Sequence, residues 1–127
     1  MTKKIEAIIR KEKLSSVMSA LSEVGIVGLN ITEVRGRGRG VGMTLKWRTG
    51  TYVVELLPRT MISIVLSDDN IDATVEAIRK AAYTGERGDG MIFVLPVEQV
   101  VRISTGETGR DAISYQGDID TRKGVNA

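Results

Sequence analysis

The segment TMISIVLSDDNIDATVEAIRKAA, from Thr60 to Ala82, decides the fold because its hydrophobic periodicity changes halfway along it. Thr60–Leu66 (TMISIVL) is nearly continuous in apolar residues, which predicts a buried strand. After Asp69 the apolar residues recur at the spacing of an amphipathic helix. They are Ile71, Val75, Ile78 and Ala82. The segment therefore predicts a strand that is followed directly by a helix.

The sequence on either side extends this pattern to four strands and two helices. Lys3–Arg10 predicts a first strand, and the helical stripe that follows it stops at Gly25, where a C-terminal cap belongs. Ile26–Val34 predicts the second strand, and Met91–Ile103 predicts the fourth, bent near Pro96. This order predicts the α+β class and a ferredoxin-like βαββαβ fold, with both helices on one face of an antiparallel sheet. The other face would expose apolar residues to water, so we expect a homo-oligomer.

Composition narrows the possible functions. The 127 residues, 42% apolar and 27% charged, suit one ordinary domain. The chain contains no histidine and no cysteine, so we expect no catalytic residues and no metal site. No run approaches the roughly 18 apolar residues of a membrane span, and MTKKIEAIIR at the N-terminus opens directly into a strand pattern. We expect a soluble, cytoplasmic protein with no signal peptide and no membrane insertion.

A long insert separates the second and third strands. It runs from Gly36 to Pro58, about two dozen residues, whereas connections in compact domains usually have about 4–6. Its middle holds Trp47, the only tryptophan, and tryptophan and arginine dominate binding hot spots. The insert therefore predicts a contact surface for a partner, and Trp47 folded back onto the domain is the alternative. The basic residues around it are Arg35, Arg37, Arg39, Lys46 and Arg48.

A basic, glycine-rich insert is also compatible with a nucleic-acid-binding module that grips RNA or DNA through these arginines. The net charge is only +2, and the chain has a single phenylalanine, Phe93, although base stacking requires aromatic side chains on the sheet. We therefore favour a protein partner over a nucleic acid.

Two glycine-rich segments are candidates for anion binding. Gly85–Gly90 (GERGDG) has three glycines in six residues, so its backbone N–H groups can point into one concavity that suits phosphate. A plain turn with positive φ angles is the alternative. Gly36–Gly42 (GRGRGVG) follows the second strand. If the fold places the two segments at matching ends of adjacent or near-adjacent strands, Arg39 and Arg102 would supply charge to a phosphate held by the amides.

The sequence contains several collinear motifs, of which the longest are KKIEAIIR (Lys3–Arg10), EVGIVG (Glu23–Gly28), TEVRGRG (Thr32–Gly38) and TGERGDG (Thr84–Gly90). Through these motifs the chain resembles the PII nitrogen-regulatory signal-transduction proteins from about residue 3 to residue 107. The resemblance implies a ferredoxin-like homotrimer whose long insert is the T-loop, at about residues 36–58, that docks on target proteins. A polar C-terminal tail, residues 109–127, follows this PII-like domain of residues 1–108 and is either disordered or ordered over the nucleotide cleft.

In this family, adenine nucleotides bind in clefts between subunits, and 2-oxoglutarate and magnesium join ATP. The resemblance implies nucleotide contacts at Gly28, Gly38, Arg39, Val65, Thr84, Gly88, Asp89, Gly90 and, from the neighbouring subunit, Arg102. It also implies a partner-binding loop with Arg37, Trp47 and Tyr52, and Tyr52 matches a tyrosine that some members have uridylylated.

Four positions depart from the family pattern. Gly40 replaces the glutamine that ligates magnesium and touches 2-oxoglutarate, and Ser104 replaces an arginine. Met91 and Arg59 each replace a lysine. The loss of a cation at both position 91 and position 104 would cost about 3–6 kcal/mol of phosphate binding. We therefore expect AMP or ADP to be favoured over ATP, and the departures weigh against magnesium and 2-oxoglutarate.

The sequence thus predicts a regulatory protein rather than an enzyme, in which the nucleotide selects among conformations of the loop. The implied target is an ammonium transporter or an enzyme of nitrogen metabolism. Relatives near carboxysomes or other microcompartments depart from the 2-oxoglutarate pattern in comparable ways. A sensor of carbon or energy status, tied to inorganic-carbon metabolism, is therefore the alternative within the family.

Overall fold

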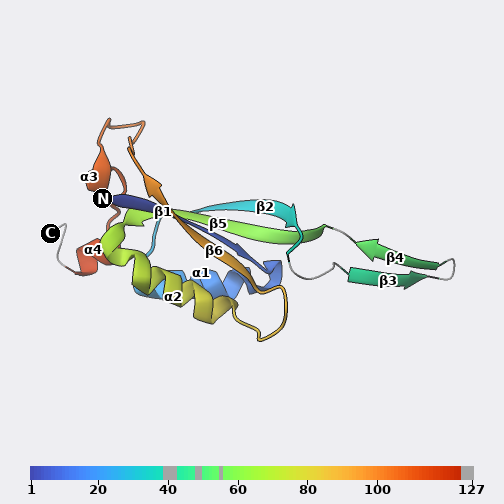
Figure 1. The fold of residues 1–127 in the computed structure, drawn as a ribbon. Helices are drawn as coiled ribbons and strands as arrows, with labels where there is room; N and C mark the ends of the chain where they lie inside the picture. Colours follow the sequence, from blue (N-terminus) through green and yellow to red (C-terminus); the bar gives the residue numbers. More distant parts are fainter. Residues whose placement is uncertain (39–42, 48–49, 55, 124–127) are drawn as a thin grey trace.

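The structure is a computed structural model of the 127-residue chain, and it describes residues 1–38, 43–47, 50–54 and 56–123 (Figure 1). The strands are β1 (Thr2–Ile9), β2 (Asn30–Gly36), β3 (Met43–Trp47), β4 (Gly50–Val54), β5 (Leu57–Ser67) and β6 (Gly90–Val97). The helices are α1 (Leu14–Val24), α2 (Ile71–Ala82) and the short α3 (Gly109–Ala112) and α4 (Ile119–Arg122). Two 3-10 turns, Lys11–Lys13 and Asp68–Asn70, lead into α1 and α2.

Four strands form one antiparallel sheet in the order β2-β5-β1-β6, and α1 and α2 pack together on one of its faces (Figure 1). β1 lies inside the sheet and pairs along its whole length with both neighbours, so that Ile9 opposes Thr60 of β5 and Gly90 of β6. This order confirms the predicted α+β class and the ferredoxin-like βαββαβ topology.

The core lies between the sheet and the two long helices. Alternate side chains of the central strands point to this side, and Ile5 and Ile9 of β1 and Ile62 of β5 are buried there. Leu21 of α1 and Ile78 of α2 complete the core from the helices. Each such side chain contributes about 1.5–3 kcal/mol when it is fully buried, so this layer fixes both helices on the sheet.

Helix α1 ends at Gly25, as the sequence predicts. Gly25 has φ +95°, and its N–H donates to the carbonyls of Leu21 and Ser22, both at 3.1 Å. The N–H of Ile26 also donates to the Leu21 carbonyl, at 2.9 Å. A Cβ added at Gly25 would lie 2.8 Å from the backbone nitrogen of Ile119. The same glycine therefore caps the helix and leaves room for the C-terminal tail.

Three predicted strand limits are wrong by three residues or more. The third strand, predicted from Thr60, is β5 and begins at Leu57. The fourth strand, predicted over Met91–Ile103, is β6 and ends at Val97. Its partner β1 begins at Thr2, opposite Val97, so no residue of β1 remains to pair with the chain beyond that point. β2 begins at Asn30 rather than at Ile26, because the chain must first return from the C-terminal cap of α1 to the edge of the sheet.

The long insert contains a hairpin that the sequence does not predict. β3 and β4 pair with each other and not with the main sheet, with Met43 opposite Val54 and Trp47 opposite Gly50. The hairpin projects beyond the ends of β2 and β5, on the right in Figure 1. Its strands are short and their alternation is weak, so periodicity alone does not reveal them.

We expect Ile62→Ala to lower the free energy of unfolding by about 2–5 kcal/mol, because it leaves a cavity at a fully buried position of β5. Urea unfolding followed by circular dichroism measures the change. Ile103→Ala, at a fully exposed isoleucine, is the matched control and should change stability by less than about 0.5 kcal/mol. Equal costs at the two positions would contradict this account of the core.

Candidate functional site

The residues predicted to bind nucleotide lie at the two ends of the sheet rather than together. We call the end at which β6 begins the turn end, and the end at which β6 finishes the tail end. The turn end carries Gly38, Thr84, Gly88, Asp89 and Gly90. The tail end carries Gly28, Val65 and Arg102. Arg39, and the departure at Gly40, lie outside the described residues.

The sequence predicts that the two glycine-rich segments lie at matching ends of adjacent or near-adjacent strands, and this prediction is wrong. Gly36 ends β2 and Gly90 begins β6, which are the two edge strands of the sheet. The strand order places both β5 and β1 between them. The segments do share one end of the sheet, but its full width separates them within one chain.

The turn of residues 84–90 is built around the carboxylate of Asp89. Oδ2 accepts the backbone N–H groups of Thr84 at 2.9 Å and of Gly85 at 3.2 Å, and Oδ1 accepts the Thr84 hydroxyl. Gly85, Gly88 and Gly90 have φ angles of +87°, +88° and +113°, in agreement with the plain-turn alternative. The amide of Gly85, a candidate for phosphate binding, and the amide of Thr84 before it therefore hold an internal carboxylate instead.

Arg10 ties this turn to the end of β1. Its Nε donates to Oδ1 of Asp89 at 3.1 Å, and its Nη2 donates to the carbonyl of Arg87. The Thr84 hydroxyl and backbone N–H, followed by Arg10 and the Gly85 N–H, hold the pKa of Asp89 well below its usual range. Asp89 is thus an ionised group whose carboxylate holds the backbone of Thr84 and Gly85 in position within the turn.

A second guanidinium group lies beside the same turn. A Cβ added at Gly88 would lie 3.0 Å from Nη2 of Arg59 and 3.6 Å from Nη2 of Arg10. Two cations against an open stretch of backbone form a surface that suits an anionic group. Arg10 is not among the predicted site residues. In the sequence it stands only as the last residue of the predicted first strand and of the KKIEAIIR motif, and its place beside the turn follows only once β1 is known to pair with β6.

Packing within the chain explains why position 90 is a glycine. A Cβ at this position would lie 1.8 Å from the carbonyl oxygen of Ile8, so the close approach of β1 and β6 requires glycine there. At Gly38, by contrast, an added Cβ would meet nothing within 4 Å. Gly90 and Gly38 therefore differ, because packing within the chain explains the glycine at position 90 and not the one at position 38.

At the tail end, Arg102 belongs to a tight hairpin that follows β6. Its N–H donates to the carbonyl of Glu107 at 2.9 Å, and Val101 forms an isolated bridge with Thr108. The Arg102 guanidinium lies over the ring of Tyr115, 5.2 Å from its centroid, and donates to the Ser114 carbonyl at 3.4 Å. An open hollow of about 700 Å³ lies between this hairpin and the tail. Its lining includes Arg102, Ser104, Thr105, Glu107, Asp111 and Tyr115.

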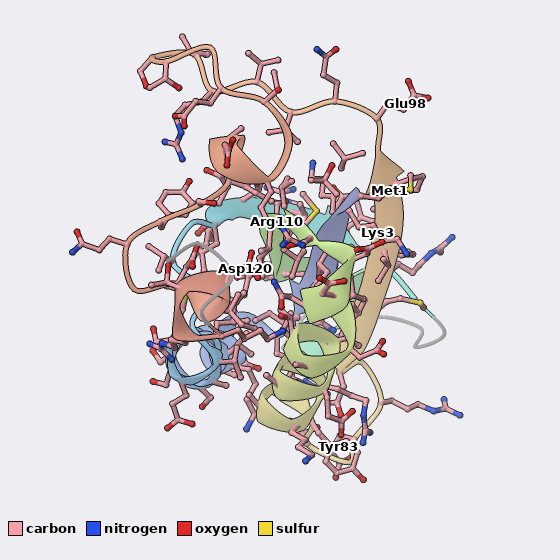
Figure 2. All side chains as sticks on the ribbon, turned by 90° about the vertical axis from the view of Figure 1, so that its left-hand side faces the viewer. Met1, Lys3, Tyr83, Glu98, Arg110 and Asp120 are labelled. Carbon is pink, nitrogen blue, oxygen red and sulfur yellow. The ribbon has the colours of Figure 1, made fainter. Side chains whose placement is uncertain are left out.

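The described part of the C-terminal tail, residues 109–123, contains the short helices α3 and α4. It packs against the tail end of the domain, on the left in Figure 1. Figure 2 shows Asp120 between α4 and the start of α2, and this buried carboxylate accepts hydrogen bonds from Ser67 Oγ at 3.2 Å and Asn70 Nδ2 at 2.9 Å. Arg110, also labelled there, donates to Asp69 Oδ2 at 3.1 Å.

One residue of the tail, Tyr115, packs against the predicted site residues of the tail end. The sequence does not single it out. The side chain of Tyr115 lies so close to Gly28 that an added Cβ would be 2.6 Å from its ring and hydroxyl oxygen. Val65 and Tyr115 also line the same small cavity, of about 30 Å³. Tyr115 therefore connects all three predicted residues of the tail end: Gly28, Val65 and Arg102.

The predicted partner-binding residues lie on or beside the projecting hairpin. Arg37 is exposed and follows β2 directly. Trp47 belongs to β3 and Tyr52 to β4, where Tyr52 is opposite Leu45 in the backbone pairing. All three therefore belong to the insert that leaves the turn end of the sheet.

The described residues form neither an acidic metal site nor a membrane-spanning helix. Within residues 1–38, 43–47, 50–54 and 56–123, no three acidic side chains gather as a metal site would need. None of the helices in this described part of the chain has the length and apolar character of a membrane span.

We expect the stability difference between the wild-type protein and Asp89→Asn to depend on pH. The pKa of Asp89 is lowered by folding, so its contribution is present above the unfolded carboxyl pKa of about 4 and is lost as the pH falls toward the folded pKa. Urea unfolding at pH 7, 5 and 3 measures this. The difference should be largest at pH 7 and shrink at pH 3. Glu86→Gln, exposed in the same turn, is the control, and a difference that grows toward pH 3 would contradict the role of Asp89.

We expect Gly28→Ala to destabilise the chain by about 1–3 kcal/mol, because the new methyl group would overlap the Tyr115 ring. In the background of Tyr115→Ala the same substitution should cost much less, which gives a coupling energy of about 0.5–3 kcal/mol in a double-mutant cycle. Gly38→Ala, with open space around it, is the control. An equal cost of Gly28→Ala in both backgrounds would show that the ring does not lie there.

Comparisons with known proteins agree with this fold and with the sequence motifs. The family model described as "Nitrogen regulatory protein P-II" matches residues 2–107. The "Nitrogen regulatory protein P-II" of Rhizobium meliloti is 55% identical over 111 residues, which cover 87% of this chain and 99% of that protein. That of Azospirillum brasilense is 54% identical over the same shares, and the "Nitrogen regulatory protein P-II 2" of Methanothermobacter thermautotrophicus is 51% identical over 87% of this chain and 96% of its own. The predicted resemblance is confirmed, and the chain belongs to the nitrogen regulatory protein P-II family.

Proposed function

We propose that the protein is a cytoplasmic regulator that binds an adenine nucleotide in clefts between its subunits and reports the occupancy to a protein target through the insert of residues 36–58. Its membership of the P-II family and the placement of the predicted site residues support this proposal. The target is an ammonium transporter or another protein of nitrogen metabolism. The protein acts by binding and not by catalysis.

The observation that carries the proposal is the separation of the two groups of site residues. β6 runs from Gly90 at the turn end to Val97 at the tail end, which is about 23 Å at the usual rise of a strand. This distance exceeds the length of a nucleoside diphosphate, so one ligand cannot touch both groups within one chain. A turn end from one chain and a tail end from another would complete the site.

An uncovered apolar sheet face supports assembly of the chain with itself. On the side away from the helices, Met91, Phe93 and Leu95 of β6 are 60%, 45% and 37% exposed. Ile8 of β1 and Met61 of β5 lie beside Met91 on the same face, because the three are cross-strand neighbours. An apolar area of this kind is stabilised when other copies cover it. We propose a homotrimer.

The charges at the turn end support an anionic ligand with few phosphate groups. Arg59 lies against Gly88, whereas Arg10 is already engaged by Asp89. Met91, beside the turn, carries no charge, and at the tail end Ser104 lines the same hollow as Arg102. The available cations thus suit the first phosphates of AMP or ADP better than the full triphosphate, and glycine at position 40 supplies no side-chain ligand for magnesium and 2-oxoglutarate.

The same end of the sheet supplies the route from ligand to loop. Arg59 of β5 is directly opposite Val34 of β2, and β2 continues through Arg37 into the insert. A ligand that binds at Gly88 and Arg59 therefore contacts the strand pair from which the hairpin projects. Such a ligand can favour one hairpin arrangement over others by its different affinity for each.

We expect isothermal titration calorimetry to show tighter binding of ADP than of ATP, and no effect of 2-oxoglutarate with magnesium on ATP binding. Arg59→Ala should weaken ADP binding about 10- to 100-fold, because a hydrogen bond to a charged group contributes about 1.5–3 kcal/mol. Arg35→Ala, an exposed arginine on β2, is the matched control. Tight ATP binding that depends on 2-oxoglutarate would contradict the proposed ligand preference.

We expect light scattering after size-exclusion chromatography to give the mass of a trimer for the wild-type protein. Phe93→Asp should shift the protein to a monomer, because a carboxylate on the apolar face would be buried without a partner. Ser19→Asp places the same charge on the exposed side of α1 and should leave the trimer intact. A trimeric Phe93→Asp protein would place the interface on another surface.

A further inference from the structure

The side chain of Tyr115 occupies the space in front of the predicted tail-end site. It lies against the Cα of Gly28, where even one added methyl group would be 2.6 Å from the ring. The guanidinium of Arg102 covers its ring, 5.2 Å from the centroid, and Val65 lines the same small cavity. A glycine surface, an aliphatic side chain and a stacked guanidinium are also what a flat purine ring would bind.

The position of Tyr115 is fixed by the segment that follows it. Asp118 caps α4, because its carboxylate accepts the N–H groups of Tyr115 and Thr121, both at 2.8 Å. The N–H of Ile119 donates to the carbonyl of Gly25 at 2.7 Å. Arg122 reaches back to the carbonyl of Glu23, also at 2.7 Å. With the buried Asp120, these contacts anchor the tail to α1 and to the start of α2.

This anchored segment lies beyond the part of the chain that the family shares. The family model ends at residue 107, and the alignment with the Rhizobium meliloti protein spans 111 residues, 99% of that protein. The chain has 127 residues, so 16 of them remain outside that alignment. The segment of residues 114–123 therefore lies beyond the residues that the family model matches.

We propose that the tail of residues 114–123 is an intramolecular competitor of the nucleotide: Tyr115 occupies the place of the purine at Gly28, Val65 and Arg102, and the ligand binds only when the tail leaves. This inference rests on the proposed nucleotide-binding function. It adds an autoinhibitory contact that makes the response depend on how firmly the tail is docked.

The size of the effect follows from the docked fraction. If only the undocked state binds ligand, the apparent dissociation constant equals the intrinsic one divided by the undocked fraction. A tail that is docked about 90–99% of the time weakens nucleotide binding about 10- to 100-fold. Its removal from the site strengthens binding by the same factor.

Calorimetric titration of the full chain with ADP tests the competition. Tyr115→Ala, which removes the ring, should bind ADP about 10- to 100-fold more tightly than the wild-type protein. Tyr115→Phe keeps the ring and should stay within about threefold of it. Arg122→Ala loosens an exposed anchor far from the site and should also tighten binding, although by less. If Tyr115→Ala binds ADP no more tightly than the wild-type protein, the competition is refuted.

Hydrogen exchange supplies a second readout. Saturating ADP should reduce the protection of the amide of Ile119, because its acceptor, the carbonyl of Gly25, lies outside the tail and is lost when the tail leaves. Increased protection would mean that the tail closes over the ligand, which overturns the proposal while nucleotide binding stands. If neither the wild-type protein nor Tyr115→Ala binds ADP, AMP or ATP at millimolar concentration, the nucleotide-binding function itself fails, and the competition with it.

Discussion

β1 keeps two neighbouring strands in register at once, and the rest of the arrangement depends on this pairing. At the turn end it brings Arg10, which follows β1, to the turn that precedes β6, while β5 brings Arg59 from the other side. A slip of one residue would turn the side chains of β1 to the opposite face and would remove Ile5 and Ile9 from the core. The burial of these isoleucines therefore enforces the geometry of the turn.

The turn end is organised before any ligand arrives. The carboxylate of Asp89 satisfies amides that would otherwise need a partner, and Arg10 holds this carboxylate on the sheet. In the proposed site a ligand would therefore not have to order the turn, which would reduce the entropic cost of binding. The charge of Arg59 and the exposed backbone at Gly88 would then be available for recognition.

The two segments that extend from the ferredoxin-like sheet leave it at opposite ends (Figure 1). The β3–β4 hairpin extends from the turn end, and the tail with α3 and α4 covers the tail end. In the proposed assembly, a nucleotide bridges the turn end of one chain and the tail end of another. It would then act on the hairpin of the first chain and on Tyr115 of the second. Both the hairpin and the tail would therefore respond to one ligand.

The sequence by itself determined the order of the four strands of the main sheet and of the two long helices, the cap at Gly25, the long insert and the family, because hydrophobic periodicity and glycine motifs are local properties. The end of β6 at Val97, the separation of the two glycine-rich segments, the contact of Arg10 with Asp89 and the place of Tyr115 were decided only by the tertiary structure. Each of them depends on pairing or packing between residues far apart in the chain. No local pattern encodes which distant partner a residue meets.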